Sequence, residues 1–171
     1  MADGASAMET GFAPSAQTAR AFRDALGQFA TGVTLATIDG PTGPMGFTAN
    51  SFSSVSLDPP LVLWSLARSS RRFEYFATAP HFAIHVLAAE QAGLIDRFGR
   101  HGAGFDGLDH ALNAQRVPLI EGALARFECD LHATHEGGDH LIVVGRVTRA
   151  VCRGGAPLVF VQGRMDQIAR V

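Results

Sequence analysis

The chain has 171 residues, of which 47% are hydrophobic, and it carries a formal net charge of −2 with an isoelectric point near 6.4. That length suits one domain with a real hydrophobic core and is too short for two ordinary domains. Since no basic run or arginine-rich face stands out, nucleic acid is not expected as a partner. No apolar stretch approaches the roughly 20 residues that cross a bilayer, so we expect a soluble protein without a membrane segment.

The 14 basic residues are all arginine, which excludes catalysis through a lysine Schiff base. Cys129 and Cys152 fall in segments that read as strands and lack CxxC spacing, so both are expected in the core. The chain opens with no charged and apolar leader, which favours the reducing cytoplasm as its compartment.

The first elements in chain order are an arm and a helix. Residues 1–16 are rich in Ala, Gly, Ser and Pro, which predicts a disordered arm before one domain over residues 17–171. Apolar residues recur at helical spacing over residues 18–29 and predict a short amphipathic helix. A strand over residues 33–38 is predicted next.

The middle of the chain alternates between the two periodicities. Strands are predicted over residues 46–51, 61–66 and 81–87, and helices over residues 69–79 and 90–98. Residues 55–60 are predicted to connect the first two of these strands, and Pro80 ends the first helix. The glycine-rich residues 99–107 predict a mobile loop.

The last third predicts a long hairpin. Two alternating runs, residues 123–135 and 141–152, are separated by residues 136–139, whose Gly-Gly-Asp composition suits a tight turn. A short strand over residues 158–161 follows. Six or seven strands, joined mostly by short turns with helices between them, predict a mainly β (α+β) antiparallel barrel and not a doubly wound sheet.

The segment from residue 46 to residue 62 interleaves apolar residues with short polar side chains and ends in a double proline. Strand pairing alone favours Val and Ile, whereas hydroxyls and amides suit the polar edge of a flat ligand or a phosphate. An edge strand followed by a serine-rich turn fits the same pattern. The polar residues are Thr48, Asn50, Ser51, Ser53, Ser54 and Ser56.

A candidate anion site lies where a predicted strand passes into a predicted helix. Residues 65–72 combine serine hydroxyls, arginines and the free amides of a helix N-terminus, a set that binds phosphate. Arg71 and Arg72 are adjacent, so they cannot both point inward. An ordinary serine cap with solvated arginines is the alternative.

The third candidate is Gly138-Asp139-His140 at the mouth of the predicted hairpin. A histidine beside a carboxylate suits hydrogen bonding or charge stabilisation near a reacting ligand. A turn aspartate followed by a histidine at the start of a strand is the alternative.

Other sites are disfavoured by the motifs. There is no Walker loop or dinucleotide fingerprint and no Gly-x-Ser-x-Gly elbow. His132 and His135 stand three apart in a strand and point to opposite faces, so no metal site is expected. Trp64, the one tryptophan, is expected in the core.

Together these segments resemble the short-chain flavin reductase family, the FMN-binding split-barrel proteins that serve as reductase components of two-component flavin monooxygenases. The resemblance spans about residues 20–165. It is carried, in this order, by residues 22–33, 46–52, 54–62, 82–87, 138–140 and 157–160.

The resemblance implies a homodimeric antiparallel split barrel with short flanking helices. It implies transfer of a hydride from NADH (or NADPH) to FMN (or FAD) and supply of the reduced flavin to a partner monooxygenase. His140 is implied to help seat the nicotinamide, with Asp139 orienting it or shaping the turn, and Phe98 and Arg100 are implied to border the flavin. The other implied flavin contacts are Thr48, Ala49, Asn50 and Ser51 at the ring and ribityl chain, and Ser65, Leu66, Ala67, Arg68 and Ser70 at the ribityl and phosphate end.

Alternatives remain open on the sequence. A flavin-dependent reductase of a metal centre, such as cob(II)yrinic acid or ferric iron, would use the same residues. A non-catalytic flavin-binding module would not need residues 138–140, and an enzyme like pyridoxine-phosphate oxidase would want lysines that the chain lacks. No arginine pair is clearly placed to read a 2′-phosphate, which favours NADH. Many relatives carry a tyrosine where this chain has Phe160 and Met165, so no hydroxyl contact is expected there.

Overall fold

The computed structural model describes residues 11–99 and 103–167, so most of the predicted N-terminal arm lies outside the described residues. Residues 11–16 are exposed and form neither helix nor strand. The helices are α1 (Ala19–Leu26), α2 (Phe73–Thr78), the 3₁₀ helix η1 (Ala89–Gln91) and α3 (Gly93–Gly99). The strands are β1 (Thr31–Gly32), β2 (Thr34–Gly40), β3 (Gly43–Ala49), β4 (Ser53–Leu57), β5 (Pro60–Ala67), β6 (His81–Val86), β7 (His110–Leu112), β8 (Pro118–Ile120), β9 (Ala125–Gly137), β10 (His140–Cys152), β11 (Leu158–Val161) and β12 (Arg164–Gln167).

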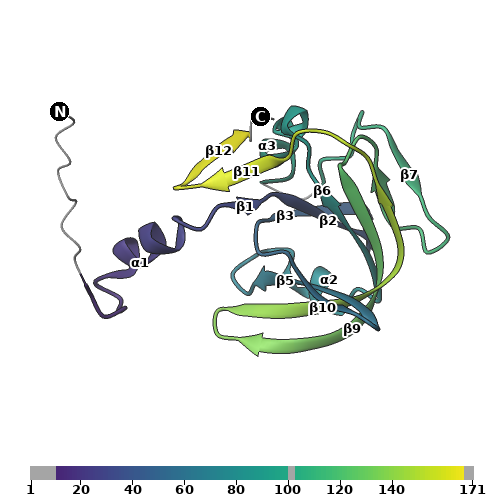
Figure 1. The fold of residues 1–171 in the computed structure, drawn as a ribbon. Coiled ribbons are helices and arrows are strands. Elements are labelled where there is room, and N and C mark those ends of the chain that lie inside the picture. The colour runs from purple at the N-terminus through teal and green to yellow at the C-terminus, as the bar shows by residue number, and fades with distance from the viewer. Residues whose placement is uncertain (1–10, 100–102, 168–171) are drawn as a thin grey trace, which may run out of the picture.

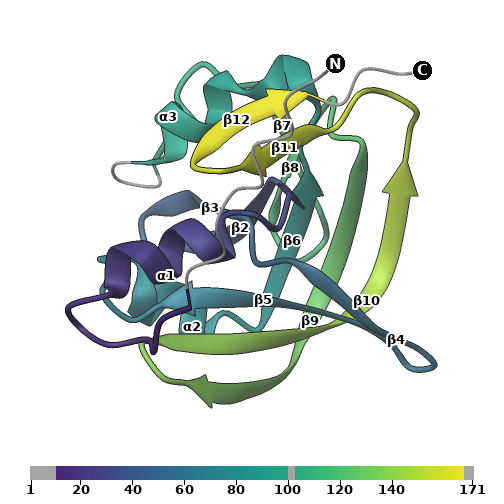
Figure 2. The same cartoon turned by 60° about the vertical axis from the view of Figure 1, so that its left-hand side comes forward.

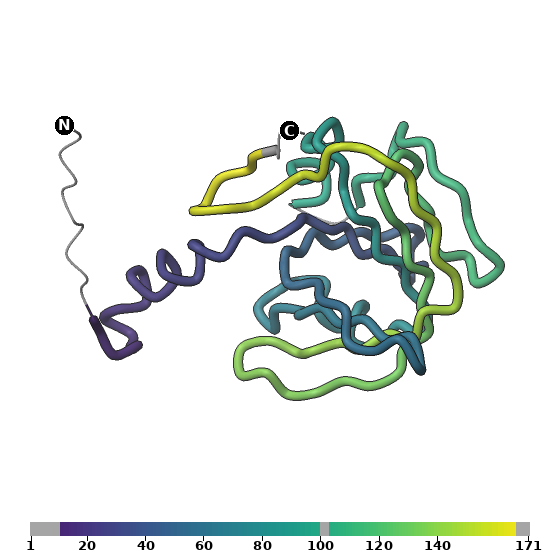
Figure 3. The backbone as a smooth tube through the Cα atoms, viewed as in Figure 1, coloured from purple at the N-terminus to yellow at the C-terminus, as the bar shows by residue number. Residues whose placement is uncertain are grey.

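Seven strands form one antiparallel sheet in the order β3-β2-β6-β9-β10-β5-β4, which curls into a barrel (Figure 1). Strands β1, β11 and β12 form a second sheet, and β7 and β8 form a two-stranded hairpin. Figure 2 shows the long β9–β10 hairpin along one side of the barrel and α3 with the β11–β12 hairpin at one end. Helix α1 projects away from the barrel (Figure 3). The mainly β, antiparallel split barrel expected from the sequence is confirmed.

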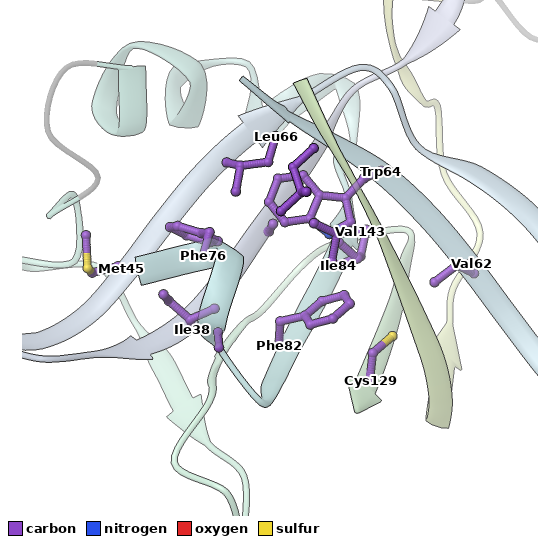
Figure 4. Close-up of a cluster of buried hydrophobic side chains, with 13 residues drawn as sticks. Ile38, Met45, Val62, Trp64, Leu66, Phe76, Phe82, Ile84, Cys129 and Val143 are labelled. Carbon is purple, nitrogen blue, oxygen red and sulfur yellow. The ribbon is translucent and has the colours of Figure 1, made fainter. Parts of the chain in front are cut away.

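Aromatic side chains close the barrel between β3 and β5, which share no backbone ladder. The ring of Phe47 on β3 lies 5.5 Å from that of Trp64 on β5, measured between centroids, and Phe76 of α2 lies 5.6 Å from Phe47. Trp64 is 1% exposed, as expected for a core residue, and Phe82 packs on its other side (Figure 4). Burial of each such ring stabilises the fold by about 2–3 kcal/mol, so α2 is held to the barrel by its apolar face.

Most of the predicted elements are present. The strands predicted over residues 33–38, 46–51, 61–66, 81–87, 123–135, 141–152 and 158–161 correspond to β2, β3, β5, β6, β9, β10 and β11. The predicted connection over residues 55–60 was wrong, because it contains most of β4. As the edge strand of the sheet, β4 pairs with β5 alone and keeps its serines at the surface. Strands β1, β7, β8 and β12 were missed, since two to four residues carry too little periodicity to read.

Two other expectations need correction. Helix α2 begins only at Phe73, because residues 69–72 form a turn that leads into it. Cys152 is exposed, whereas Cys129 is buried as expected. The difference follows from the length of β10, whose pairing with β5 ends at Arg146 while its last residues pair only with β9. The end of β10 therefore extends past the core.

His85 joins three strands inside the protein. Its ring is fully buried, with Nδ1 3.0 Å from the carbonyl oxygen of Leu35 on β2, while Nε2 accepts the amide of Ile120 on β8 at 3.0 Å. Since Nε2 accepts, Nδ1 carries the proton and donates to Leu35. Burial lowers the pKa of His85 to about 4, with a smaller opposing effect from the bond to Leu35. The neutral ring therefore pins the β7–β8 hairpin to the barrel.

We expect this histidine to make stability sensitive to acid. The unfolded chain binds a proton on His85 at an ordinary pKa near 6.5, whereas the folded chain does so at about 4. Stability therefore falls as the pH drops through 6.5 toward 4, by about 3 kcal/mol from this group. Urea unfolding of the wild type and His85→Gln at pH 7 and pH 4 measures the effect. Glutamine can donate and accept but does not titrate, so the variant should lose about 3 kcal/mol less on acidification; an equal loss in both chains would contradict the assignment.

Candidate functional site

The polar end of β3 opens onto a small slot. Thr48, Ala49 and Asn50 line this slot, whose volume is about 170 Å³. Its other walls are apolar and are formed by Val33, Ile95, Phe160 and Met165. A flat ligand with one polar and one apolar edge fits such a lining, because the polar groups fix its orientation while the apolar walls are removed from water.

A larger groove of about 860 Å³ adjoins the slot and shares Asn50 and Phe160 with it. One side of the groove is formed by α1 and the residues just after it, and the other side by the turn of the β11–β12 hairpin. Its polar lining includes Arg23, Gln28 and Gln162, and Gln162 donates to the side-chain oxygen of Gln28 at 3.0 Å. The groove falls within the size range of small-molecule sites.

Ser51, two residues after the end of β3, makes a structural hydrogen bond. Its hydroxyl accepts the amide of Ser65 at 2.9 Å and lies 3.3 Å from the carbonyl oxygen of the same residue. The predicted ring-contacting segment and the predicted phosphate-end segment are therefore bonded directly to each other. This contact brings the two sequence motifs into one site.

The entry to α2 gathers the predicted anion-binding residues. The hydroxyl of Ser70 accepts the amide of Arg72 at 3.2 Å in the turn that precedes the helix. The guanidinium of Arg68 lies over the ring of Phe73 at 5.2 Å and pairs with Glu136. Arg71 is exposed and Arg72 points inward, which agrees with the expectation that only one of them faces the interior.

The turn of the β9–β10 hairpin, with Asp139 and His140, lies beside the start of α2. His140 pairs across β10 and β5 with Ala67, and the backbone carbonyl of Asp139 accepts the amide of Arg68 at 3.0 Å. Nδ1 of His140 lies 2.7 Å from the Asp139 carboxylate, and this hydrogen bond lowers the pKa of that carboxyl. An ionised carboxylate only accepts, so Nδ1 donates and Nε2 is left to meet a ligand.

Two predicted contacts are buried where a ligand cannot reach their side chains. Leu66 and Phe98 each expose 0% of their surface. Leu66 packs in the barrel core, so its backbone alone is available to a cofactor. Phe98 packs against Phe105 with ring centroids 5.0 Å apart and supports the site from behind. Arg100 lies outside the described residues.

The sequence did not single out all of the residues that shape the site. Arg72 was one of a pair of candidates, and its donor role to two backbone carbonyls became visible only in the fold. Phe160 and Met165 were noted only as departures from the relatives, yet both line the slot. Neither cavity is lined by Arg68, Ser70 or His140.

Across residues 11–99 and 103–167 no three His, Cys, Asp or Glu side chains gather in a way that would hold a metal ion. In the same part of the chain no helix is long and apolar enough to span a membrane. What the site offers is a set of hydroxyl, amide, guanidinium and imidazole groups that can bind and orient ligands.

Comparisons of the sequence and of the structure with known proteins both find flavin reductases. The family model described as flavin reductase like domain matches residues 26–169. The FMN reductase (NADH) SmoA of Agrobacterium fabrum is 55% identical over 159 residues, which cover 93% of this chain and 91% of SmoA. The reductase component of the flavin-dependent trigonelline monooxygenase of Acinetobacter baylyi is 44% identical over 84% of this chain, which spans 47% of that protein's length.

A solved structure agrees over nearly the whole chain. The NADH:FAD oxidoreductase SgcE6 of Streptomyces globisporus superimposes with a TM-score of 0.86 and is 36% identical, covering 94% of this chain and 98% of its own. The split barrel, the polar end of β3 and the Asp139–His140 pair at the hairpin mouth thus occur in a chain that belongs to the flavin reductase family.

Proposed function

We propose that this protein oxidises NADH, or less favourably NADPH, and transfers the hydride to FMN or FAD, and that it supplies the reduced flavin to a separate monooxygenase in the cytoplasm. The observation that carries the proposal is the junction of three motifs. The end of β3 is bonded to β5 through Ser51 and Ser65, and β5 is paired with the hairpin mouth at Ala67 and His140. The segments that we propose for the flavin ring, the phosphate and the nicotinamide are thus bonded to one another in a chain of this family.

The residues present fit a flavin. Its ring system is flat, with a polar edge and an apolar edge, and the slot beside Thr48 and Asn50 has both kinds of wall. Arg68 supplies a cation for a phosphate, and Ser70 in the turn before α2 supplies a hydroxyl group. When bound, the flavin supplies the chemistry as a hydride acceptor.

The role of the protein is to hold two rings in contact. Hydride transfer needs no side-chain nucleophile, so its rate depends on proximity, alignment and exclusion of water. Within the described residues Nε2 of His140 has no hydrogen-bond partner, and we place its contact with the nicotinamide nucleotide there, while Asp139 holds the ring in one tautomer.

We expect NADH oxidation by the purified protein under air to depend on added flavin. The absorbance of NADH should fall rapidly with FMN, FAD or riboflavin present, and the initial rates rank the three flavins. NADPH should support a slower rate, because no arginine pair is clearly placed for a 2′-phosphate. Saturable flavin binding without turnover on either nucleotide would replace the proposal with a non-catalytic flavin-binding module.

Replacement of His140 should weaken binding of the nicotinamide nucleotide without weakening binding of the flavin. His140→Ala should raise the KM for NADH by about tenfold and leave the dissociation constant for FMN nearly unchanged. His132→Ala is the matched control, because His132 is an exposed histidine of the same hairpin and lies in β9 farther from the turn. Steady-state kinetics and flavin titration measure both values. A normal KM for NADH in His140→Ala would exclude the role given to this ring.

We also propose that the protein is a homodimer joined through α1. None of the residues of α1 is buried, and its large apolar side chains are exposed to solvent. Phe22 is 42% exposed and Leu26 59%, and Phe29 just beyond the helix is 76% exposed. These side chains form an apolar surface on a helix that projects from the barrel (Figure 1). Apolar surface of this kind is normally covered by a partner, and a second copy would also cover the groove beside α1.

Charged substitutions on α1 should separate the dimer. Leu26→Glu combined with Phe29→Glu should yield a monomer in sedimentation at micromolar concentration, because two buried charges cost more than the contact gains. Leu112→Glu serves as the control, since Leu112 is a similarly exposed leucine on β7, far from α1. A wild-type protein that sediments as a monomer at every concentration would refute the proposed dimer.

A further inference from the structure

Arg72 joins three segments that border the site. Its Nη1 donates to the carbonyl oxygen of Gly46 on β3 at 2.6 Å and to that of Phe98 on α3 at 2.8 Å. Its guanidinium carbon lies 4.8 Å from the centroid of the Phe47 ring. Its own backbone begins α2, because its carbonyl accepts the amides of Tyr75 and Phe76 at 3.2 Å. One side chain therefore connects β3, α3 and α2.

Both carbonyl oxygens lack a partner in regular structure. β3 is an edge strand of the barrel sheet, so every second carbonyl faces away from β2. Phe98 stands in the last turn of α3, where carbonyls have no amide within the helix and the helix dipole favours a cation. A guanidinium satisfies both needs, because it presents several donors in one plane and stacks on an aromatic ring.

The contact between α3 and β3 leaves no room for adjustment. A Cβ on Gly46 would lie 2.4 Å from Cδ1 of Phe98, so this buried ring rests directly on the strand backbone. Thr48 stands two residues after Gly46, and in an antiparallel strand its amide and carbonyl face the same open edge. The position of Gly46 thus sets the position of the polar groups at Thr48.

Arg72 also fixes the opposite end of the site. Its amide donates to Ser70, and Arg68 stands four residues before it in the same turn. Within the described residues no carboxylate lies within 4.0 Å of the Arg72 guanidinium, although Arg72 is half-buried and burial lowers its pKa. Carbonyl groups and an aromatic ring are its partners, so its bonds do not compete with an acidic neighbour.

We infer that Arg72 is a positioning residue that holds the ring-contacting edge of β3 and the phosphate-contacting start of α2 at a fixed separation. The inference rests on the proposed flavin site and adds a residue to it that does not touch the flavin. Without the Arg72 side chain β3 and α2 could move apart, and a ligand that spans both would lose contacts at one end.

The test compares two neighbouring arginines. Arg72→Met should raise the dissociation constant for FMN by about 10- to 100-fold. Arg71→Met removes the same charge from an exposed neighbour and should change it by less than about twofold, as is usual for an exposed charge. The KM for NADH at saturating FMN should stay near the wild-type value in both. Millimolar guanidinium should restore FMN affinity in Arg72→Met and leave Arg71→Met unchanged.

Fluorescence titration of FMN and thermal unfolding of the same samples separate the outcomes. Equal weakening by the two substitutions would overturn the inference, since charge alone would then explain the effect. A lower melting temperature with normal FMN affinity would also overturn it, because Arg72 would then serve only the fold. Arg72→Lys keeps the charge and so protects folding, and its affinity for FMN should lie between those of the wild type and Arg72→Met. If Arg72→Lys and Arg72→Met both bind FMN as tightly as the wild type, the inference is overturned. A wild-type protein that binds no flavin would instead refute the proposed function.

Discussion

The barrel closes between β3 and β5 through side chains and not through a ladder of backbone hydrogen bonds. Ser51 bonds the backbone of Ser65, and the rings of Phe47 and Trp64 meet inside. A ladder at this place would have consumed the amides and carbonyls along the edge of β3. Because the closure is made by side chains, that edge stays open beside the slot, and the same feature stabilises the barrel and provides a binding surface.

Structural and binding duties are divided among residues that look alike in sequence. Ser51 and Ser70 each make hydrogen bonds to backbone groups that hold the fold. Arg72 is turned inward to two carbonyls, while Arg71 beside it faces solvent. Short polar side chains at a strand end or helix start usually hydrogen-bond to nearby backbone groups, since an unpaired buried amide or carbonyl costs about 1–3 kcal/mol. A ligand then meets the groups that remain.

The sequence predicted the fold well where periodicity is long. Apolar and polar residues alternate along the 13-residue strand β9, and the apolar runs of β10 and β6 also predict strands. It failed where a few residues make an element or where a strand lies at an edge. β4 consists largely of serine and reads as a turn, because an edge strand needs no apolar partner on its outer side.

The site was predictable as a set of motifs but not as a geometry. The hydroxyl-rich segment, the serine-arginine turn and Gly138-Asp139-His140 are recognisable by composition and order. No local pattern shows that Ala67 pairs with His140, or that Phe98 rests on Gly46, because these contacts depend on the register of distant strands and helices. The buried placement of Leu66 and Phe98 was missed for the same reason.

The two ends of the site differ in how firmly they are held. Arg68 and its partner Glu136 are 37% and 78% exposed at their side chains, and an exposed ion pair of this kind contributes at most about 1 kcal/mol. Exchange of Glu136 for a ligand phosphate therefore costs little. Arg72, in contrast, is half-buried and bonded to two backbone carbonyls, so the edge of β3 is rigid. If flavin binds as proposed, a rigid ring end with an exchangeable phosphate end favours precise alignment for hydride transfer while still allowing the flavin to leave.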